Sequence, residues 1–325
     1  MTGKRIPSSP TDEVPMETGA ALWAKRLARE SKPRTARRRL RHTAPAPPAA
    51  FGMGKVLAAA LSLMGLQKRG EQNALDIAPR TYPFHFDNLP PAFDGFRILH
   101  LSDFHFDQRP HFTERLCAVV STIEADLCVM TGDYHQRHCP TSEPTIEGMR
   151  RLTRVVRAHC GIIGVLGNHD FSRFLKPFRE FGVRILLNES VALTRAGERI
   201  WFIGVDDPHD FRCDALAWAA RSVPQDAFRI LLVHSPEIVP EAHVHHIHLY
   251  ICGHTHGGQV CLPGIGAVSF NTRARRAYCK GPWRAGDLQG FTTFGAGTTE
   301  VPVRFNCPPE VALIELHRTG PTQGP

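Results

Sequence analysis

FRILHLSDFH, residues 96–105, is the stretch that decides the fold. Its first six residues form an apolar run of strand length, and polar residues follow at once. Further along come a helical pattern (113–123), an apolar strand (127–131) with Gly132-Asp133, another helical pattern (146–158), and a strand (161–166) with Gly167-Asn168-His169-Asp170. This alternation predicts an α/β fold with parallel strands and crossover helices. Such sheets bind ligands at the carboxyl ends of their strands, where each polar cluster falls.

The second half of the chain adds strands with shorter connections. We expect a strand over 80–86, a helix over 174–181, and strands over 183–187, 191–194, 199–205, 229–233, 247–252, 291–294, 302–305 and 311–316. The short turns between 183 and 205 favour antiparallel pairing in that part. The strand 229–233 is followed directly by His234.

Two histidines one residue apart follow the run 247–252, in Gly253-His254-Thr255-His256-Gly257-Gly258-Gln259. Glycines let the backbone bend so that both rings can point into one cavity. Histidine is the commonest side-chain metal ligand, so the pair indicates a metal site. The alternative is a pair of turn histidines that bond to solvent and backbone.

Polar residues at five strand ends together predict a metal centre. They are Asp103, His105, Asp133, Asn168, His169, His234, His254 and His256. An aspartate or histidine after one strand is ordinary, but five such clusters are hard to explain as caps. The mixture of carboxylate, amide oxygen and imidazole suits Mn²⁺, Fe or Zn²⁺. The set is too large for one ion, and two ions about 3.5–4 Å apart would use it.

The order D-x-H, G-D, G-N-H-D, H and G-H-x-H resembles the calcineurin-like metallophosphoesterases. The resemblance runs from about residue 80 to 316. Gly204-Val205-Asp206-Asp207, G-H-T-H-G-G-Q and the segment 302–310 are more similar still to bacterial phosphodiesterases grouped with UDP-2,3-diacylglucosamine hydrolases. The fold that this resemblance implies is a four-layer α/β/β/α sandwich, with two mixed β-sheets face to face and helices outside.

The resemblance also implies a role for each residue. Asp103, His105 and His256 would hold one metal ion, Asn168, His234 and His254 the other, and Asp133 would bridge them. His169 would be the general acid, oriented by Asp170. The implied activity is hydrolysis of a phosphodiester or pyrophosphate by metal-activated hydroxide, on a lipid-linked substrate. A catalytically silent metal-binding scaffold and a phosphodiesterase acting on a soluble nucleotide are the alternatives.

The ends of the chain differ in composition. The 325 residues are 42 % hydrophobic and 22 % charged, as in an ordinary globular protein, and the net charge of +8 favours anionic partners. We predict a basic, largely disordered tail over 1–79, with an apolar segment (54–66) too short to span a bilayer, before a catalytic domain over 80–325. The tail favours an anionic membrane surface over a specific nucleic acid. Secretory export and a tail without function are the alternatives.

The nine cysteines are dispersed, without a CxxC pair. They indicate reduced thiols in a cytoplasmic protein. Together with the basic tail, the apolar segment 54–66 and the resemblance, they lead us to expect a protein bound peripherally at the inner membrane face.

Other polar features are less specific. The histidines 243, 245, 246 and 248 are interpreted as a solvated loop, and Asp206-Asp207 as a turn. His135, His138 and Cys139 are interpreted as a polar loop, with the mouth of a pocket as the alternative. For Arg304, contact with a phosphate and pairing with a carboxylate both stay open.

Overall fold

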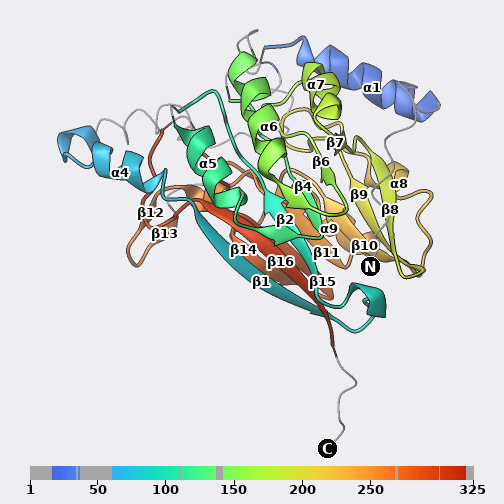
Figure 1. Ribbon diagram of the computed structural model, residues 1–325. Coiled ribbons are helices and arrows are strands. Elements are labelled where there is room, and N and C mark those ends of the chain that lie inside the picture. The colour runs from blue at the N-terminus through green and yellow to red at the C-terminus, as the bar shows by residue number, and fades with distance from the viewer. Residues whose placement is uncertain are drawn as a thin grey trace, which may run out of the picture.

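The computed structural model describes residues 17–33, 36, 61–109, 111–136, 142–267, 270–299 and 301–319. Within these ranges, two six-stranded sheets pack face to face and helices cover their outer faces (Figure 1). The predicted four-layer α/β/β/α sandwich is confirmed.

The first sheet contains the strand of residues 96–101 together with strands that precede and follow it in the chain. Its order is β1 (Ala78–Phe86), β16 (Glu310–Arg318), β2 (Phe96–Leu101), β4 (Leu127–Met130), β6 (Ile162–Gly164) and β7 (Val183–Ile185). All neighbours are parallel except β16 and β2. Its outer face packs against α5 (Phe112–Val120), α6 (Glu143–Val155) and α7 (Leu175–Glu180).

The second sheet has a parallel centre and antiparallel edges. Its order is β14 (Gly281–Ala285), β15 (Leu288–Thr292), β11 (Leu249–Cys252), β10 (Phe228–Leu232), β9 (Glu198–Gly204) and β8 (Glu189–Arg195). Strands β9, β10, β11 and β15 are parallel, and β8 and β14 are antiparallel to their neighbours. On its outer face lie α8 (Leu216–Ala219) and α9 (Val239–Val244).

Strand β2 shows why the layers stack in this way. Phe96 and Ile98 point into the core between the sheets, whereas Leu99 and Leu101 pack against the helices. His100 lies between the sheets, where its Nε2 shares a hydrogen bond of 2.8 Å with the Thr131 hydroxyl. Burial lowers the pKa of His100 to about 3, so the ring is neutral. A strand that is apolar on both faces is therefore buried on both.

Short elements complete the described chain. They are α4 (Gln67–Asn73), β3 (Glu124–Ala125), β5 (Arg157–Ala158), β12 (Cys261–Leu262), β13 (Gly266–Ala267), and the 3₁₀ turns η2 (Pro91–Phe93), η3 (Ser172–Phe174), η4 (Pro236–Ile238), η5 (His256–Gly258) and η6 (Arg276–Tyr278). No helix in the described ranges is long and apolar enough to cross a membrane.

Two predictions about the second half of the chain are wrong. Only β8 and β9 pair antiparallel between 183 and 205, because β7 joins the first sheet beside β6 and is parallel to it. Residues 302–305 form an isolated bridge between Phe305 and Val260 instead of a strand. In both places the partner is distant in sequence, and turn length does not reveal it.

The prediction of disorder over 1–79 is wrong for residues 17–33 and 61–79. Helix α1 (Glu17–Glu30) lies near α7 (Figure 1), and its Arg26 is buried against Asp206. In α4, Gly70 packs so closely on Val303 and Phe305 that a Cβ there would lie 2.6 Å from the Phe305 ring. Composition predicts disorder where apolar residues are few, and polar contacts hold α1. Residues 1–16 and most of 34–60 lie outside the described ranges.

Candidate metal centre

The eight predicted site residues meet at one edge of the molecule, across the seam between the two sheets. Loops after β2, β4 and β6 of the first sheet supply five of them, including His169. Loops after β10 and β11 of the second sheet supply the remaining three. Each side chain is at most 6 % exposed. The carboxyl ends of parallel strands thus bring together residues that are up to 153 positions apart in the sequence, from 103 to 256.

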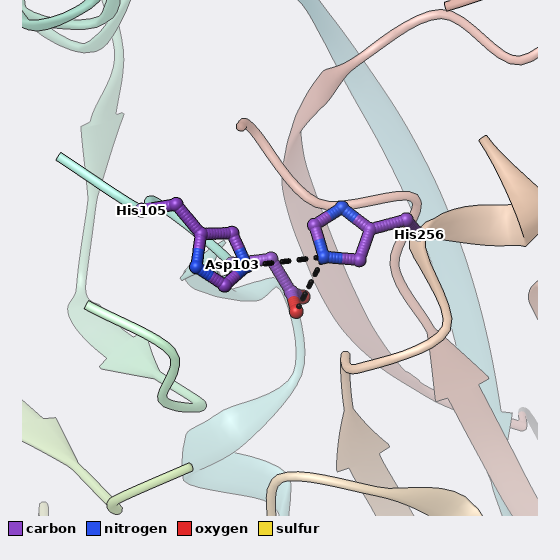
Figure 2. A group of neighbouring side chains, drawn as sticks. All are labelled: Asp103, His105 and His256. Atoms are coloured by element: carbon purple, nitrogen blue, oxygen red, sulfur yellow. Dashed lines mark hydrogen bonds and ion pairs between the residues drawn. The ribbon is translucent and has the colours of Figure 1, made fainter. Parts of the chain in front are cut away.

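The first group consists of Asp103, His105 and His256 (Figure 2). His256 Nε2 lies 3.3 Å from Asp103 Oδ1 and 3.2 Å from His105 Nε2. Figure 2 shows the two rings on opposite sides, with the carboxylate between and below them. Three potential ligand atoms therefore face one small volume.

The second group consists of Asp133, His234 and His254, with Asn168 beside them. His234 Nε2 is central to it. This atom lies 3.2 Å from Asp133 Oδ2, 3.2 Å from His254 Nδ1 and 3.1 Å from Asn168 Oδ1. Two ring nitrogens, a carboxylate oxygen and an amide oxygen thus converge.

Asp133 connects the two groups through a single oxygen. Its Oδ2 is 3.2 Å from His234 Nε2 in the second group and 3.7 Å from His105 Nε2 in the first. Its other oxygen, Oδ1, accepts the His169 backbone N–H at 3.0 Å. The carboxylate is therefore held in the orientation that a bridging ligand needs.

Three of the four candidate imidazoles are oriented as metal-binding histidines are. In the fourth, His256, Nδ1 lies 3.3 Å from the Arg304 guanidinium and accepts from it. His105 Nδ1 donates to the His135 carbonyl at 3.1 Å, His234 Nδ1 to the Thr131 carbonyl at 2.7 Å, and His254 Nε2 to the Asn271 carbonyl at 2.7 Å. In each neutral ring the proton then sits on the outer nitrogen, and the nitrogen facing the group carries a lone pair. This arrangement fits cation binding, because lone pairs that face each other without a proton or cation repel.

The backbone of this site is strained. Five of the candidate ligands have positive φ although none is glycine: Asp103 (57°), His105 (47°), Asp133 (54°), His254 (72°) and His256 (49°). Each such residue costs about 1–3 kcal/mol, and such residues cluster at functional sites. Tight packing enforces the geometry. A Cβ on Gly167 would lie 2.3 Å from Asp133 Oδ1, and one on Gly253 would lie 2.2 Å from Asp103 Oδ2.

Charge in the centre is tightly coupled. Burial by itself lowers the pKa of His234, but Asp133 and Asp103 raise it to about 10. Burial raises the pKa of Asp133, but nearby imidazoles, His234 foremost, lower it well below its usual range. Burial raises the pKa of Asp103 to about 6 against the opposing effect of His234. A positive charge therefore stabilises the ionised carboxylates of Asp103 and Asp133, and a proton on His234 or a cation can provide it.

His169 lies beside the first group, where its ring is 5.4 Å from the His105 ring, centre to centre, and edge-on to it. Its Nδ1 donates to the Gln136 carbonyl at 2.9 Å. The expectation that Asp170 orients this ring is wrong. The Asp170 carboxylate accepts backbone N–H groups of residues 133, 134, 135 and 167 at 2.7–3.2 Å. Asp170 therefore fixes the loops, and the Gln136 carbonyl orients the histidine.

The less specific features have structural roles. Asp207 accepts the N–H groups of residues 209, 210 and 211, which confirms a turn. Within the described chain, Arg304 pairs with no carboxylate; it is buried and donates to the carbonyls of His256, Cys307, Gly295 and Gly297.

The two histidine-rich features also differ. His243, in α9, and His246 are exposed, but the solvated-loop interpretation is wrong for His248. The half-buried His248 ring stacks on Phe228 at 4.7 Å and accepts the Arg229 N–H at 3.0 Å. His135 is buried against the Thr145 hydroxyl, at 2.8 Å. His138 and Cys139 lie outside the described residues.

Sequence reasoning missed two side chains that touch the candidate ligands. Asp210 Oδ2 accepts a hydrogen bond of 3.2 Å from Asn168 Nδ2, which turns Asn168 Oδ1 toward His234. The His209 ring lies 4.0 Å from the His254 ring, and its Nδ1 pairs with Glu237 Oε1 at 2.7 Å. Both follow the end of β9, so the strand-end rule that found the other clusters could have identified them.

Comparison with known proteins agrees with this geometry. Residues 96–258 match the calcineurin-like phosphoesterase family. The chain is 30 % identical over 241 residues to the uncharacterized metallophosphoesterase YkuE of Bacillus subtilis, which covers 71 % of this chain and 82 % of that protein. It is 26 % identical over 256 residues to the uncharacterized metallophosphoesterase YkoQ of the same organism (76 % and 93 % covered). It is also 26 % identical over 243 residues to the phosphodiesterase YaeI of Escherichia coli (72 % and 85 %).

The family match spans half of the chain, and the similarity to YkuE covers 71 % of it. The family is metal-dependent, and its members hydrolyse phosphoric esters. The two groups of candidate ligands described above could each hold a metal ion. This chain belongs to the calcineurin-like phosphoesterase family and is a metal-dependent phosphoric ester hydrolase.

Proposed function

We propose that the protein hydrolyses a phosphodiester or pyrophosphate bond with two divalent or transition-metal ions, Mn, Fe or Zn. The observation that carries this proposal is the position of Asp133 Oδ2 between two groups of ligand atoms. Asp103, His105 and His256 would hold one ion, and Asn168, His234 and His254 the other. Two adjacent ions, when bound, supply charge neutralisation at the phosphoryl oxygens and a hydroxide nucleophile near neutral pH.

The remaining chemistry belongs to the chain itself. His169 is the general acid that protonates the leaving oxygen, because its Nδ1 is tied to the Gln136 carbonyl and its other nitrogen can carry the transferred proton. Asp133 Oδ1 accepts the backbone N–H of His169 and so fixes the backbone at that residue. Proton transfer and ligand geometry are therefore linked through one carboxylate.

An assay of the metal-loaded protein against a graded panel tests this function. The panel contains an aryl phosphomonoester, a bis-aryl phosphodiester, a nucleotide diester and a nucleotide–lipid pyrophosphate. We expect turnover of a diester or pyrophosphate to exceed that of the monoester, and to disappear when a chelator removes the metal. A protein that binds two ions but hydrolyses none of the panel would instead be a silent metal-binding scaffold.

We expect metal uptake to release protons. At pH 7 the metal-free His234 carries a proton, since its pKa is about 10, and this proton must leave before the nitrogen can bind an ion. About one proton per chain should therefore be released at pH 7. A second should join it below pH 6, where Asp103 is protonated. Affinity consequently rises with pH. Calorimetry in buffers of different ionisation enthalpy measures this number, and His234→Gln should remove the release at pH 7.

The substrate class that we favour is a lipid-linked phosphate, with the enzyme bound peripherally at the cytoplasmic face of a membrane. Two exposed apolar sites support it: Leu63 and Met64 are 89 % and 60 % exposed, and Ile265 is 74 % exposed. Packing of Leu61 against Val260 joins the two segments. The basic residues over 25–41 other than the buried Arg26 would add about 1 kcal/mol for each one near an anionic surface.

Sedimentation with vesicles containing phosphatidylglycerol tests the membrane proposal. The full chain should pellet with them at low salt and dissociate at high salt. Leu63→Asp combined with Ile265→Asp should weaken binding, whereas Val244→Asp, at a 71 % exposed site on α9, is the matched control and should not. A wild-type chain that stays in the supernatant at low salt would favour a soluble nucleotide diester as substrate.

A further inference from the structure

Among the described residues of the N-terminal segment, Arg26 of α1 is the most deeply buried cationic side chain, with 1 % exposure. It lies far outside the residues that match the family, 96–258. Its guanidinium donates in three directions: through Nη1 to Asp206 Oδ1, through Nη2 to the Asp170 carbonyl at 2.6 Å, and through Nε to Glu30 at 2.8 Å. The Phe211 ring covers it, 3.6 Å from Cζ. Arginines are almost never buried this fully without a complete set of partners.

The Asp170 carbonyl connects Arg26 to the loop after β6, which carries Asn168 and His169. Asp170 follows Asn168 and His169 directly, and its carboxylate gathers the backbone N–H groups around Asp133. Glu30, which Arg26 also contacts, accepts the Ser172 N–H at 2.8 Å and the Ser172 hydroxyl at 2.7 Å. Helix α1 therefore contacts the backbone just after His169, at residues 170 and 172.

Asp206 connects Arg26 to the second loop. Besides Arg26, Asp206 Oδ1 accepts the Asp207 N–H at 2.7 Å, and the Asp207 carboxylate in turn shapes the turn that contains Asp210. Asp210 accepts from Asn168 Nδ2. Arg29 of the same helix donates to the carbonyls of Phe211 and Arg212. The Arg26 guanidinium thus contacts both the loop that carries Asn168 and the loop that carries Asp210, the hydrogen-bond partner of Asn168.

We propose that Arg26 is a positioning residue of the active site, and that α1 is a structural part of the centre although it lies outside the family domain. Arg26 holds the loop of Asn168 and His169 against the loop of Asp210, so that the Asn168 amide oxygen faces the second ligand group. The proposal rests on the proposed function insofar as Asn168 is taken to be a ligand of the second ion.

The chemistry of the side chain explains why arginine is needed. Its three acceptors are the carboxylates of Asp206 and Glu30 and the Asp170 carbonyl, and a planar guanidinium reaches all of them at once. A lysine could keep the charge beside Asp206 but would lose the fixed fork of donors. The Arg26→Lys variant therefore separates charge from geometry.

The experiment compares Arg26→Lys and Arg26→Gln with Lys25→Gln, an exposed neighbour on the same helix that serves as the matched control. Mn²⁺ binding to the full chain is measured by calorimetry, and the order within the Asn168 loop by amide hydrogen exchange. Loss of a residue that supports a ligand costs about 10–100-fold in metal affinity or activity. We expect this loss at one of the two ions, with the other unchanged, faster exchange over 168–172, and a fall in kcat larger than any rise in KM. Lysine should not restore the wild-type values.

Several outcomes would overturn the inference. One is wild-type affinity for both ions, with wild-type exchange, in Arg26→Lys, which keeps the buried charge and is the variant expected to fold in any case. Another is equal weakening of both ions, which would indicate general destabilisation. The metal and exchange measurements do not need a substrate. A wild-type chain that binds two ions but hydrolyses nothing would therefore contradict the proposed function and leave the Arg26 comparison intact.

Discussion

Asp133→Ala is expected to reduce the bound metal from two ions to one or fewer and to abolish most activity. The carboxylate lies 3.7 Å from His105 in the first ligand group and 3.2 Å from His234 in the second. Its removal also leaves His234 without the partner that raises its pKa most. Metal ions contribute several kcal/mol of transition-state stabilisation, so turnover should fall by at least about 10³-fold, or ~4 kcal/mol. Elemental analysis of protein purified without chelators, together with kcat/KM, gives both numbers.

Asp126→Ala is the control for this variant. Asp126 accepts the Arg97 N–H at 2.8 Å and precedes β4, at the end of the sheet opposite the centre. Its loss should lower stability by about 1–3 kcal/mol through the unpaired N–H, and leave the metal content at two. Full metal content and activity in Asp133→Ala would remove the bridging role, and with it the dinuclear proposal.

His169→Ala should lower kcat strongly while the metal content stays at two. General acid–base groups contribute about 10²–10⁴-fold. The ring contacts the Gln136 carbonyl and lies beside His105 without belonging to either ligand group. The loss should shrink for an activated aryl ester, since its leaving group needs no proton. The measurement is the dependence of kcat on the pKa of the leaving group, which should steepen in the variant.

His100→Gln serves as the comparison for His169→Ala. His100 is buried between the sheets, bonds to the Thr131 hydroxyl, and belongs to neither ligand group. This variant should change stability and keep the wild-type leaving-group dependence. Equal losses for aryl and alkyl esters in His169→Ala would assign His169 to substrate binding instead of proton transfer.

The sequence predicted alternating strands and helices, with polar residues at strand ends that share an edge. Asp103 and Asp133 follow β2 and β4 of one sheet, so their neighbourhood follows from topology. His234 follows β10 of the other sheet, and only the resemblance to a family indicated that the two sheets meet there. The separation of the ligands into two groups came only from the resemblance to a family. No spacing in the chain indicates that Asp133 reaches both.

What could not be predicted depends on polar contacts over long sequence distances. Arg26 binds Asp206 across 180 residues, and nothing in a basic, apolar-poor stretch indicates that partner. Asp170 follows His169 in sequence, which suggested that it orients the ring, but its carboxylate faces backbone N–H groups instead. In both cases the direction of one side chain decides the role. Composition and periodicity carry no information about that direction.

The position of the centre across the seam between the sheets has a mechanical consequence. Each ligand group draws from both sheets: Asp103 and His105 face His256, and Asp133 faces His234 and His254. An ion held by either group therefore cross-links the two halves of the sandwich at this edge. By linkage, binding free energy then opposes any motion that opens the sheets apart. Metal starvation would thus leave a molecule that is looser along this edge and cut sooner by proteases, in addition to one that has lost its chemistry.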